Sequence, residues 1–349
     1  MPTVTFLNKQ GRVAVDCQEG ETLLQAGLRQ GVPLPYGCGA GVCSTCVARA
    51  RPGTVETGWA DAPGAQNLKH DKGECLLCQS LVTDDCENLV PGKIDLAQTL
   101  AETPAQHRAR LHDVALVAPD VATFQVSLEG QSDYTAGQYF LVRLEGMQGY
   151  RPYSMTDFQR GAQTLNFVIK RLPNGRFSEE IFSNDVSEAK VDVFGPMGLA
   201  TFDPSDPNES RDLVCLVGGS GIAGIMSVLD RAVSVNHFES HRLFMVFGVR
   251  RREDFFFLDE LKRIKESAPD NVSIHLAVSE EEGSEELDAY RDFPLHQGFV
   301  HEVAERLGDG MFENRLAFLG GPPAMLTGSL GLLLGAGLPV TDIRYDRFG

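Results

Sequence analysis

The 349-residue sequence predicts a multidomain protein with three architectures in series: a small β-rich α+β module, an antiparallel β-barrel and a parallel-sheet α/β module. Three observations predict this order. A loop rich in cysteine and glycine lies within the β-rich residues 1–95; short strands with little helix fill residues 109–208; and apolar strands alternate with helices in residues 209–349. The polar, alanine-rich segment 96–108 is predicted to be a linker.

The first module is predicted from alternation and helical periodicity. Apolar and polar residues alternate at Val4–Phe6 and Val13–Val15, which is typical of a hairpin turning near Gly11. Residues 22–30 place apolar side chains on one helical face, and residues 87–96 are expected to form a closing strand.

Four cysteines in this module have a spacing with chemical meaning. Four residues lie between Cys38 and Cys43, and two lie between Cys43 and Cys46. A further 31 residues lie between Cys46 and Cys78. This is the ligand spacing of plant-type [2Fe–2S] ferredoxins, in which each iron takes two thiolates. Gly37, Gly39 and Gly41 suit such a loop because glycine reaches positive φ and permits close backbone approach, so that N–H groups can point at the sulfides.

A zinc site is the alternative interpretation of the same cysteines. Cys43 and Cys46 form one C-x-x-C pair, and Cys75 and Cys78 form another, 28 residues later. That gap is longer than in a usual zinc ribbon, and zinc leaves Cys38 unexplained. Iron–sulfur is therefore favoured, with Cys75 as a small buried hydrophobe.

Composition and sequence pattern argue against nucleic-acid partners, membrane insertion and secretion. The net charge of −17 argues against nucleic-acid binding, which needs a basic face. The sequence has no signal peptide and no run of 18 apolar residues, so no membrane span is expected. Eight cysteines without a secretion signal indicate metal ligation in a reducing cytoplasm.

The second and third modules are predicted element by element. Strands are expected over 111–118, 121–128, 139–144 and 165–170, with a short helix near 178–183. Further buried strands are expected over 213–217, 243–247, 272–278 and 316–319, with helices from the Gly-rich turn to about 235 and around 255–266, 300–307 and 323–336.

Motifs in these modules resemble a known family. Arg151-Pro152-Tyr153-Ser154 resembles the R-x-Y-S signature of the ferredoxin-NADP reductase superfamily, and residues 175–178 and 320–325 resemble its G-x-x-S and C-G-P-P-x-M motifs. With a ferredoxin-like module in front, the whole chain is similar to reductase components of bacterial oxygenases. Residues 61–64 and 345–348 favour the toluene monooxygenase type over the benzoate dioxygenase type. The resemblance implies a β-grasp ferredoxin domain, an FAD-binding barrel and an NAD-binding domain.

The resemblance also implies a flavin site. Arg151 would bind the FAD diphosphate, Tyr153 would stack on the isoalloxazine beside Pro152, and Ser154 would lie at flavin N5. The strand backbone at Val168 and Lys170 would contact the pyrimidine edge. The remaining implied residues are Gly175, Arg176, Phe177 and Ser178, which would present N–H groups to phosphate at a helix start. FAD is expected over FMN because FMN-containing relatives usually carry the ferredoxin module at the other end.

The nucleotide site is implied by a second glycine-rich turn. Gly219, Ser220 and Gly221 fit the family's G-G-T/S-G-I-A-P variant, with Gly224 in place of the usual proline, and would admit the dinucleotide together with Gly321 and Pro322. After Ser279, three glutamates (280–282) would repel the 2′-phosphate of NADPH, so NADH is expected. The three arginines 250–252 keep NADPH open, and Arg250 is expected to contact the dinucleotide.

Two positions near the predicted hydride-transfer site stand out. The family's cysteine before G-P-P is Gly320 here, which is expected to leave room beside the nicotinamide and to make hydride transfer slower or looser. Phe348 resembles the terminal aromatic that covers the flavin's other face in relatives; packing at a chain end is the alternative. Ser154 and Phe348 are therefore the expected catalytic residues.

Electron counting, together with what the resemblance implies, leads to a predicted function. NADH gives two electrons as hydride, a [2Fe–2S] cluster takes one, and a flavin handles both. The predicted protein is a monomeric NADH-dependent reductase of aromatic-hydrocarbon catabolism, with a Rieske or di-iron terminal oxygenase, or its intermediary ferredoxin, docking near residues 37–45. A non-oxygenase acceptor such as a deoxysugar dehydratase, and a non-redox zinc module, are the alternatives.

Overall fold

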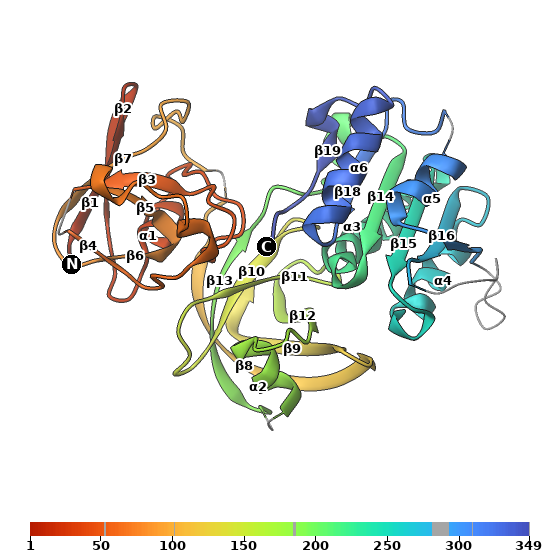
Figure 1. Cartoon of the computed structure of the whole chain (residues 1–349), viewed down its shortest axis with the longest axis horizontal. Coiled ribbons are helices and arrows are strands. Elements are labelled where there is room, and N and C mark those ends of the chain that lie inside the picture. Colours follow the sequence, from red (N-terminus) through yellow and green to blue (C-terminus); the bar gives the residue numbers. More distant parts are fainter. Residues whose placement is uncertain (52–53, 101, 184–185, 281–292, 309, 349) are drawn as a thin grey trace.

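The computed structural model describes residues 1–51, 54–100, 102–183, 186–280, 293–308 and 310–348. Its three large sheets follow one another along the chain. Figure 1 shows them as three bodies, with the first module at one end, the nucleotide module at the other and the barrel joining them. The C-terminus returns to the middle of the molecule, so the end of the chain lies close to the barrel (Figure 1). The predicted fold class is confirmed.

The first module has a five-stranded mixed sheet in the order β2-β1-β7-β3-β5. Its strands are β1 (Thr3–Asn8), β2 (Gly11–Asp16), β3 (Val47–Ala50), β5 (Glu74–Leu76) and β7 (Cys86–Leu89), and β4 (Val55–Thr57) pairs separately with β6 (Ser80–Val82). The helix α1 (Leu23–Arg29) begins with a capping box in which Thr22 and Gln25 exchange hydrogen bonds. The closing strand ends earlier than predicted, at Leu89, because Pro91 has no N–H to extend the ladder.

The second module is a six-stranded antiparallel sheet in the order β11-β10-β13-β8-β9-β12. The strands are β8 (Ala105–Ala118), β9 (Val121–Ser132), β10 (Tyr139–Leu144), β11 (Arg151–Ser154), β12 (Ala162–Lys170) and β13 (Ala189–Met197), with the helix α2 (Arg176–Ser183) beside them. A bridge between Met155 and Phe167 joins the two edge strands and curls the sheet into a barrel. β8 begins at Ala105, inside the predicted linker, because its first residues pair with β13. The domain boundaries at 95, 108 and 208 stay a prediction.

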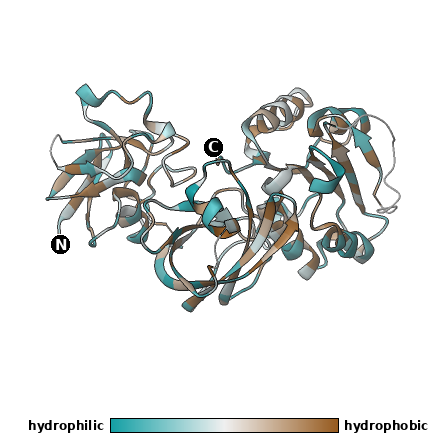
Figure 2. Cartoon of the chain, turned by 60° about the horizontal axis from the view of Figure 1, so that its bottom comes forward, coloured by the Kyte–Doolittle hydropathy of each residue, from teal (hydrophilic) through white to brown (hydrophobic). Residues whose placement is uncertain are grey.

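The third module is a parallel sheet in the order β17-β16-β15-β14-β18-β19. Its strands are β14 (Leu213–Gly218), β15 (Leu243–Val249), β16 (Val272–Val278), β17 (Leu295–Gln297), β18 (Leu316–Gly320) and β19 (Ile343–Arg344); its helices are α3 (Ile222–Ser234), α4 (Leu258–Ser267), α5 (Val300–Leu307) and α6 (Pro323–Gly335). The strand order reverses at β14, which places a crevice at the carboxyl ends of β14 and β18. Hydrophobic residues gather on the strands of this sheet (Figure 2). Among the described residues, no helix is long and apolar enough to cross a membrane.

Candidate functional site

The four predicted cysteine ligands lie in two pairs. Cys46 Sγ lies 3.3 Å from Cys78 Sγ, and the thiols of Cys38 and Cys43 hydrogen-bond with each other. This contact, with donors from Thr45, lowers the pKa of the Cys43 thiol. Within the described part of the chain, no three His, Cys, Asp or Glu side chains converge as they would around one metal ion. Two thiol pairs fit a two-iron cluster, with two thiolates per iron, better than a single zinc ion.

The alternative zinc ligand Cys75 is engaged elsewhere. It lies on β5, where its residue pairs with Ala48 of β3, and its thiol hydrogen-bonds with Ser80. Burial raises the pKa of this thiol, which disfavours the thiolate that zinc requires. The structure therefore separates Cys75 in role from the four paired cysteines.

The glycine-rich loop holds backbone N–H groups against cysteine sulfur. The N–H of Cys38 donates to Cys43 Sγ at 3.2 Å, and those of Ala40 and Val42 donate to Cys38 Sγ at 3.4 and 3.3 Å. The loop turns back on itself through Gly39 and Gly41, whose φ values are +64° and +88°. These three N–H groups meet thiol sulfur, and such bonds tune a cluster's potential. The expected N–H bonds to the cluster sulfides stay a prediction.

The cysteine loop is packed against the barrel rather than exposed along its length. Residues 38–41 are buried, and a Cβ on Gly39 would lie 3.1 Å from Met197 Cε and 3.2 Å from Leu141 Cδ1. The predicted exposed docking loop over residues 37–45 is therefore wrong for its first half, because the barrel covers it. Only Ser44 and Thr45 of this loop are exposed.

The R-P-Y-S tetrapeptide forms β11, an edge strand of the barrel. Its Arg151 Nη1 donates to the carbonyls of Gln148 and Tyr150, at 3.5 and 3.1 Å, and among the described residues it meets no carboxylate. An anion can therefore still be bound by this guanidinium. Pro152 pairs with Leu141, and Ser154 pairs with Tyr139 on β10.

Tyr153 lies within a cluster of barrel aromatics. Its ring centroid is 5.4 Å from the rings of both Phe124 and Phe177. Burial raises the pKa of Tyr153 above its ordinary value, so the hydroxyl stays neutral. The ring is fixed in orientation by these neighbours, and its stacking on a flavin remains a prediction.

The start of α2 forms a compact loop with little space for side chains. Ser178 Oγ accepts the N–H of Leu172 at 3.0 Å, and a Cβ on Gly175 would lie 2.6 Å from this oxygen. Phe177 is buried in the barrel core, whereas Arg176 is exposed. Arg176 also lines a cavity of about 490 Å³ between the first module and the barrel, as does the cysteine ligand Cys78.

The other predicted flavin contacts lie on β12. Val168 is buried in a hydrophobic cluster shared with the nucleotide module, and Lys170 forms an ion pair with Asp120 at 3.1 Å. The side chain of Lys170 is thus occupied, which leaves its backbone as the group for the predicted contact.

The glycines predicted to admit the dinucleotide lie at the carboxyl ends of two strands. Gly219, Ser220 and Gly221 form a 3₁₀ turn between β14 and α3. Gly219 has φ +53°, and Gly321, which precedes the helix-capping Pro322, has φ +154°. These turns expose backbone at the point where parallel sheets bind nucleotides.

Gly320 does not leave open space, and the expectation of room beside the nicotinamide is wrong. A Cβ built on Gly320 would overlap the carbonyl oxygen of Gly221, and a Cβ on Gly221 would overlap the Gly320 carbonyl carbon. The two backbones pack directly against each other. A side chain at either position would force them apart.

Gly224 has a packing role that the sequence did not indicate. A Cβ at this position of α3 would lie 3.3 Å from the Cβ of Ser154 and 3.4 Å from its hydroxyl oxygen. The small residue lets the nucleotide module approach the R-P-Y-S strand closely. The two predicted sites, for flavin and for dinucleotide, thus meet at Ser154.

Charged residues flank the far end of the crevice. Arg250 Nε lies 3.4 Å from Glu280, and Arg251 Nε lies 3.9 Å from the same carboxylate. The glutamates at 281 and 282, named in the sequence prediction, lie outside the described residues. Among the described residues, Glu280 pairs with both arginines, and Glu253 also lies 3.9 Å from Arg251 Nη1.

The tertiary structure places Tyr139, which no motif indicated, beside the predicted Phe348. Phe348 lies edge-on to Tyr139, with ring centroids 5.0 Å apart, and the Tyr139 hydroxyl donates to the carbonyl of Gly37. Asp346 accepts the N–H of Leu199 at 3.1 Å and so holds the C-terminal tail in place. The local signal of Tyr139 is an aromatic residue in an apolar strand, which is too common to identify a site.

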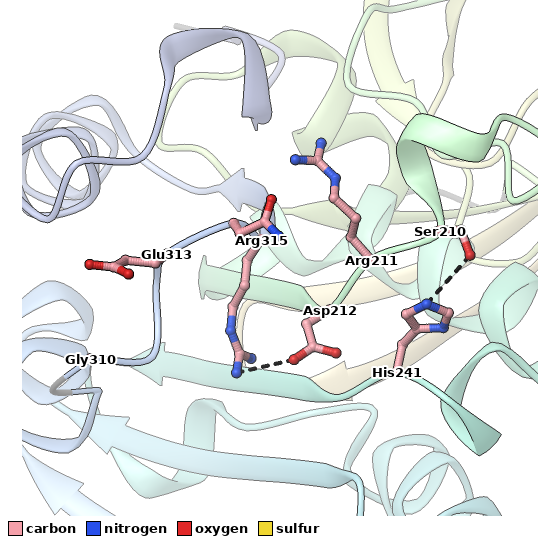
Figure 3. A pocket seen from close by; sticks show the side chains of 8 residues that line it. Ser210, Arg211, Asp212, His241, Gly310, Glu313 and Arg315 are labelled. Carbon is pink, nitrogen blue, oxygen red and sulfur yellow. Dashed lines mark hydrogen bonds and ion pairs between the residues drawn. The ribbon is translucent and has the colours of Figure 1, made fainter.

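A second cavity lies away from these sites. It has a volume of about 340 Å³ and lies at the amino ends of β14 and β18, opposite the glycine turns (Figure 3). Arg315 and Asp212 form an ion pair across it at 3.2 Å, and Ser210 contacts His241 at 3.4 Å. Nucleotides bind at the carboxyl ends of such strands, so this cavity is separate from the nucleotide site.

Comparisons with known proteins agree with this arrangement. Three family models match in sequence: a 2Fe-2S iron-sulfur cluster binding domain over residues 6–83, an oxidoreductase FAD-binding domain over 108–202 and an oxidoreductase NAD-binding domain over 215–329. The chain is 28% identical to ferredoxin--NAD(P)(+) reductase CarAd of Metapseudomonas resinovorans, covering 98% of this chain and 99% of that one. It is 25% identical to the reductase component DmpP of phenol 2-monooxygenase from Pseudomonas sp. strain CF600, covering 96% and 91%.

A solved structure extends the likeness to the whole fold. The ferredoxin reductase in carbazole 1,9a-dioxygenase superposes with a TM-score of 0.83 at 25% identity, over 100% of this chain and 98% of that one. The order of modules and the paired cysteines are thus those of an iron–sulfur flavoprotein. The chain belongs to the three-module reductases that join a [2Fe–2S]-binding, an FAD-binding and an NAD-binding domain, like the reductase components of bacterial mono- and dioxygenases.

Proposed function

We propose that this reductase takes electrons from NADH and delivers them to a terminal oxygenase component, of Rieske or di-iron type, or to its intermediary ferredoxin. One observation carries the proposal: the cysteine loop is packed against β10, the strand that pairs with the R-P-Y-S strand. The groups predicted to hold the cluster and the flavin therefore meet at one pair of adjacent strands. When bound, FAD takes two electrons from NADH as hydride and the [2Fe–2S] cluster takes one at a time.

The chain's own residues would bind and orient these groups. Arg151 and the backbone at 175–178 would bind the FAD diphosphate, Tyr153 would stack beside Pro152, and Ser154 would hydrogen-bond near N5, with backbone contacts from Val168 and Lys170. The turns at 219–221 and 321–322 would receive the dinucleotide. Phe348 would cover the flavin from the C-terminal side and exclude water from it.

The preference for NADH rests on charge. A 2′-phosphate needs free cations, and Glu280 already engages Arg250 and Arg251. A carboxylate beside the phosphate position would also repel it. NADH lacks this phosphate, so it needs no free cation there and is not repelled by the carboxylate.

The acceptor is proposed to dock on the exposed part of the cysteine loop. Ser44 and Thr45 are the exposed residues beside Cys43, and Ser44 Oγ donates to Gly64 O at 2.8 Å, so the loop edge is held in place. Eight thiols free of disulfide bonds support action in a reducing cytoplasm. The proposed acceptor is a protein, because this edge is a surface and not an enclosed pocket.

The experiment compares two cysteine variants of the flavin-loaded protein. Cys38→Ser is expected to keep NADH-dependent flavin reduction and reduction of a small dye, while losing the cluster spectrum and transfer to a protein acceptor. Cys75→Ser is the matched control. It should keep flavin reduction, dye reduction, the cluster spectrum and electron transfer to a protein acceptor. Loss of flavin reduction in a folded Cys38→Ser protein would contradict separate flavin and cluster steps, and a preference for NADPH would overturn the proposed donor.

A further inference from the structure

The side chain of Tyr139 spans the boundary between the first module and the barrel. It lies on β10 and is fully buried, and its hydroxyl donates to the backbone carbonyl of Gly37, the residue before the ligand Cys38. The two hydrogen-bonded residues are 102 positions apart in the chain. This bond is therefore a tertiary contact that attaches the cysteine loop to the barrel.

The same residue also reaches the predicted flavin side. Tyr139 is the cross-strand partner of Ser154, so their side chains lie on the same face of the sheet. Its ring is met edge-on by Phe348, and the tail that carries Phe348 is held by the Leu199 N–H bond to Asp346. One side chain thus contacts both the cysteine loop and the residues assigned to the flavin.

An apolar contact lies beside this partly buried hydrogen bond. Leu141, Phe194 and Met197 of the barrel belong to the same hydrophobic cluster as the core of the first module. Tyr36, just before the cysteine loop, accepts the N–H of Gly198 at 3.3 Å. Modules joined by polar, hydrated interfaces move relative to one another. An apolar interface that also contains hydrogen bonds restricts this motion.

We propose that Tyr139 is a positioning residue that holds the cysteine loop at a fixed place relative to the flavin strand, and so sets the rate of electron transfer from flavin to cluster. This inference rests on the proposed function. One electron leaves the reduced flavin and one arrives on the cluster in each step; Tyr139 forms and breaks no covalent bond and keeps its proton. Its contribution is geometric.

The test uses the holoprotein and removes one oxygen atom. In Tyr139→Phe, the ratio of the cluster-reduction rate to the flavin-reduction rate, followed optically after mixing with NADH, is expected to fall about five- to tenfold. This is the effect expected from the loss of one hydrogen bond between the two modules. Tyr134→Phe is the matched control, because the Tyr134 hydroxyl donates to a carbonyl, that of Asp157 at 3.1 Å, within the barrel itself. Its ratio should equal that of the wild type.

A second measurement needs no turnover. Amide hydrogen exchange of the peptide covering residues 36–41 should be about fivefold or more faster in Tyr139→Phe than in the wild type or Tyr134→Phe, since a lost contact raises local opening. If Tyr139→Phe does not fold, Tyr36→Phe, which removes the acceptor for Gly198 N–H, should give the same two changes.

The outcomes separate this inference from the proposed function. If NADH fails to reduce the cluster of the wild-type protein, the proposed function itself is wrong. If the wild-type cluster is reduced and Tyr139→Phe matches the wild type in both rate ratio and exchange, only the role of Tyr139 is overturned. A loss of flavin from Tyr139→Phe with normal exchange in residues 36–41 would also overturn it, because the residue would then serve the flavin alone.

Discussion

The carboxylate of Glu280 lies 3.4 Å from Nε of Arg250 and 3.9 Å from Nε of Arg251. Glu280 follows strand β16, and its backbone N–H donates to the carbonyl of Arg250 at 3.0 Å. Glu280 is therefore held beside the arginines by a backbone hydrogen bond as well as by charge. The two arginines flank the predicted dinucleotide site, and the acid lowers the positive potential there.

Glu280→Gln is expected to raise the ratio of kcat/KM for NADPH to that for NADH about three- to tenfold. The change removes the carboxylate that pairs with Arg250 and Arg251, although Arg251 keeps its pair with Glu253. Exposed ion pairs are worth about 1 kcal/mol or less. Steady-state kinetics with both donors measure the ratio. Glu260→Gln, which breaks the Glu260–Arg263 pair on α4, is the matched control and should leave the ratio unchanged. An unchanged ratio in Glu280→Gln would remove the charge argument for NADH.

Gly320→Ala is expected to destabilise the nucleotide module by about 1–3 kcal/mol and to raise KM for NADH. A Cβ there would overlap the Gly221 carbonyl, and overpacking against backbone cannot be relieved by a rotamer change. Thermal unfolding and NADH kinetics measure the two effects. Gly331→Ala, on α6 with open space at its Cβ position, should be neutral or slightly stabilising. A stable Gly320→Ala protein with faster flavin reduction would restore the expectation of open room.

Gly39→Ala is expected to loosen the attachment of the first module to the barrel. Gly39 has φ +64°, where a Cβ costs about 1 kcal/mol, and the new methyl group would press on Leu141 and Met197. Limited proteolysis should then cut between the modules faster, and cluster content should fall. Gly92→Ala, with open space around its Cβ position, should behave like the wild type. Equal proteolysis rates for the two variants would contradict the tight contact.

The imidazole of His275 should make the nucleotide module sensitive to acid. Burial, with further effects from the neighbouring His296 and Lys265, lowers the pKa of His275 to about 4. Since the pKa in the unfolded chain is about 6.5, the unfolded state binds more protons between these values. The stability linked to His275 is therefore fully present above about pH 6.5 and is lost as the pH falls towards 4.

Unfolding measured at pH 7.5 and pH 5 tests this dependence. His275→Gln should lose about 1–2 kcal/mol less stability than the wild type on acidification, a figure reduced for the partial exposure of the imidazole. His70→Gln, at an exposed position of the first module, should follow the wild type. A wild-type acid sensitivity that persists in His275→Gln would assign it to other groups.

Local patterns in the sequence predicted most of the fold. In the site, they predicted the four cysteines that the structure brings together in two pairs. The cysteine spacing, the helical periodicity over 22–30 and the apolar strands such as 213–217 act over a few residues, where chemistry depends on neighbours in the chain. The predicted strand over 87–96 was too long, and the start of β8 at Ala105 was missed. The start of β8 was decided by its pairing with β13, and the closing strand was ended by Pro91.

The sequence by itself determined the order of three modules and the types of side chain available for iron, phosphate and nucleotide. Only the tertiary structure decided that Tyr139 meets Gly37, that Gly221 fills the space at Gly320 and that the barrel covers half of the cysteine loop. The physical reason is distance along the chain. Residues about a hundred positions apart share no periodicity or spacing, so their contact exists only once the modules have packed.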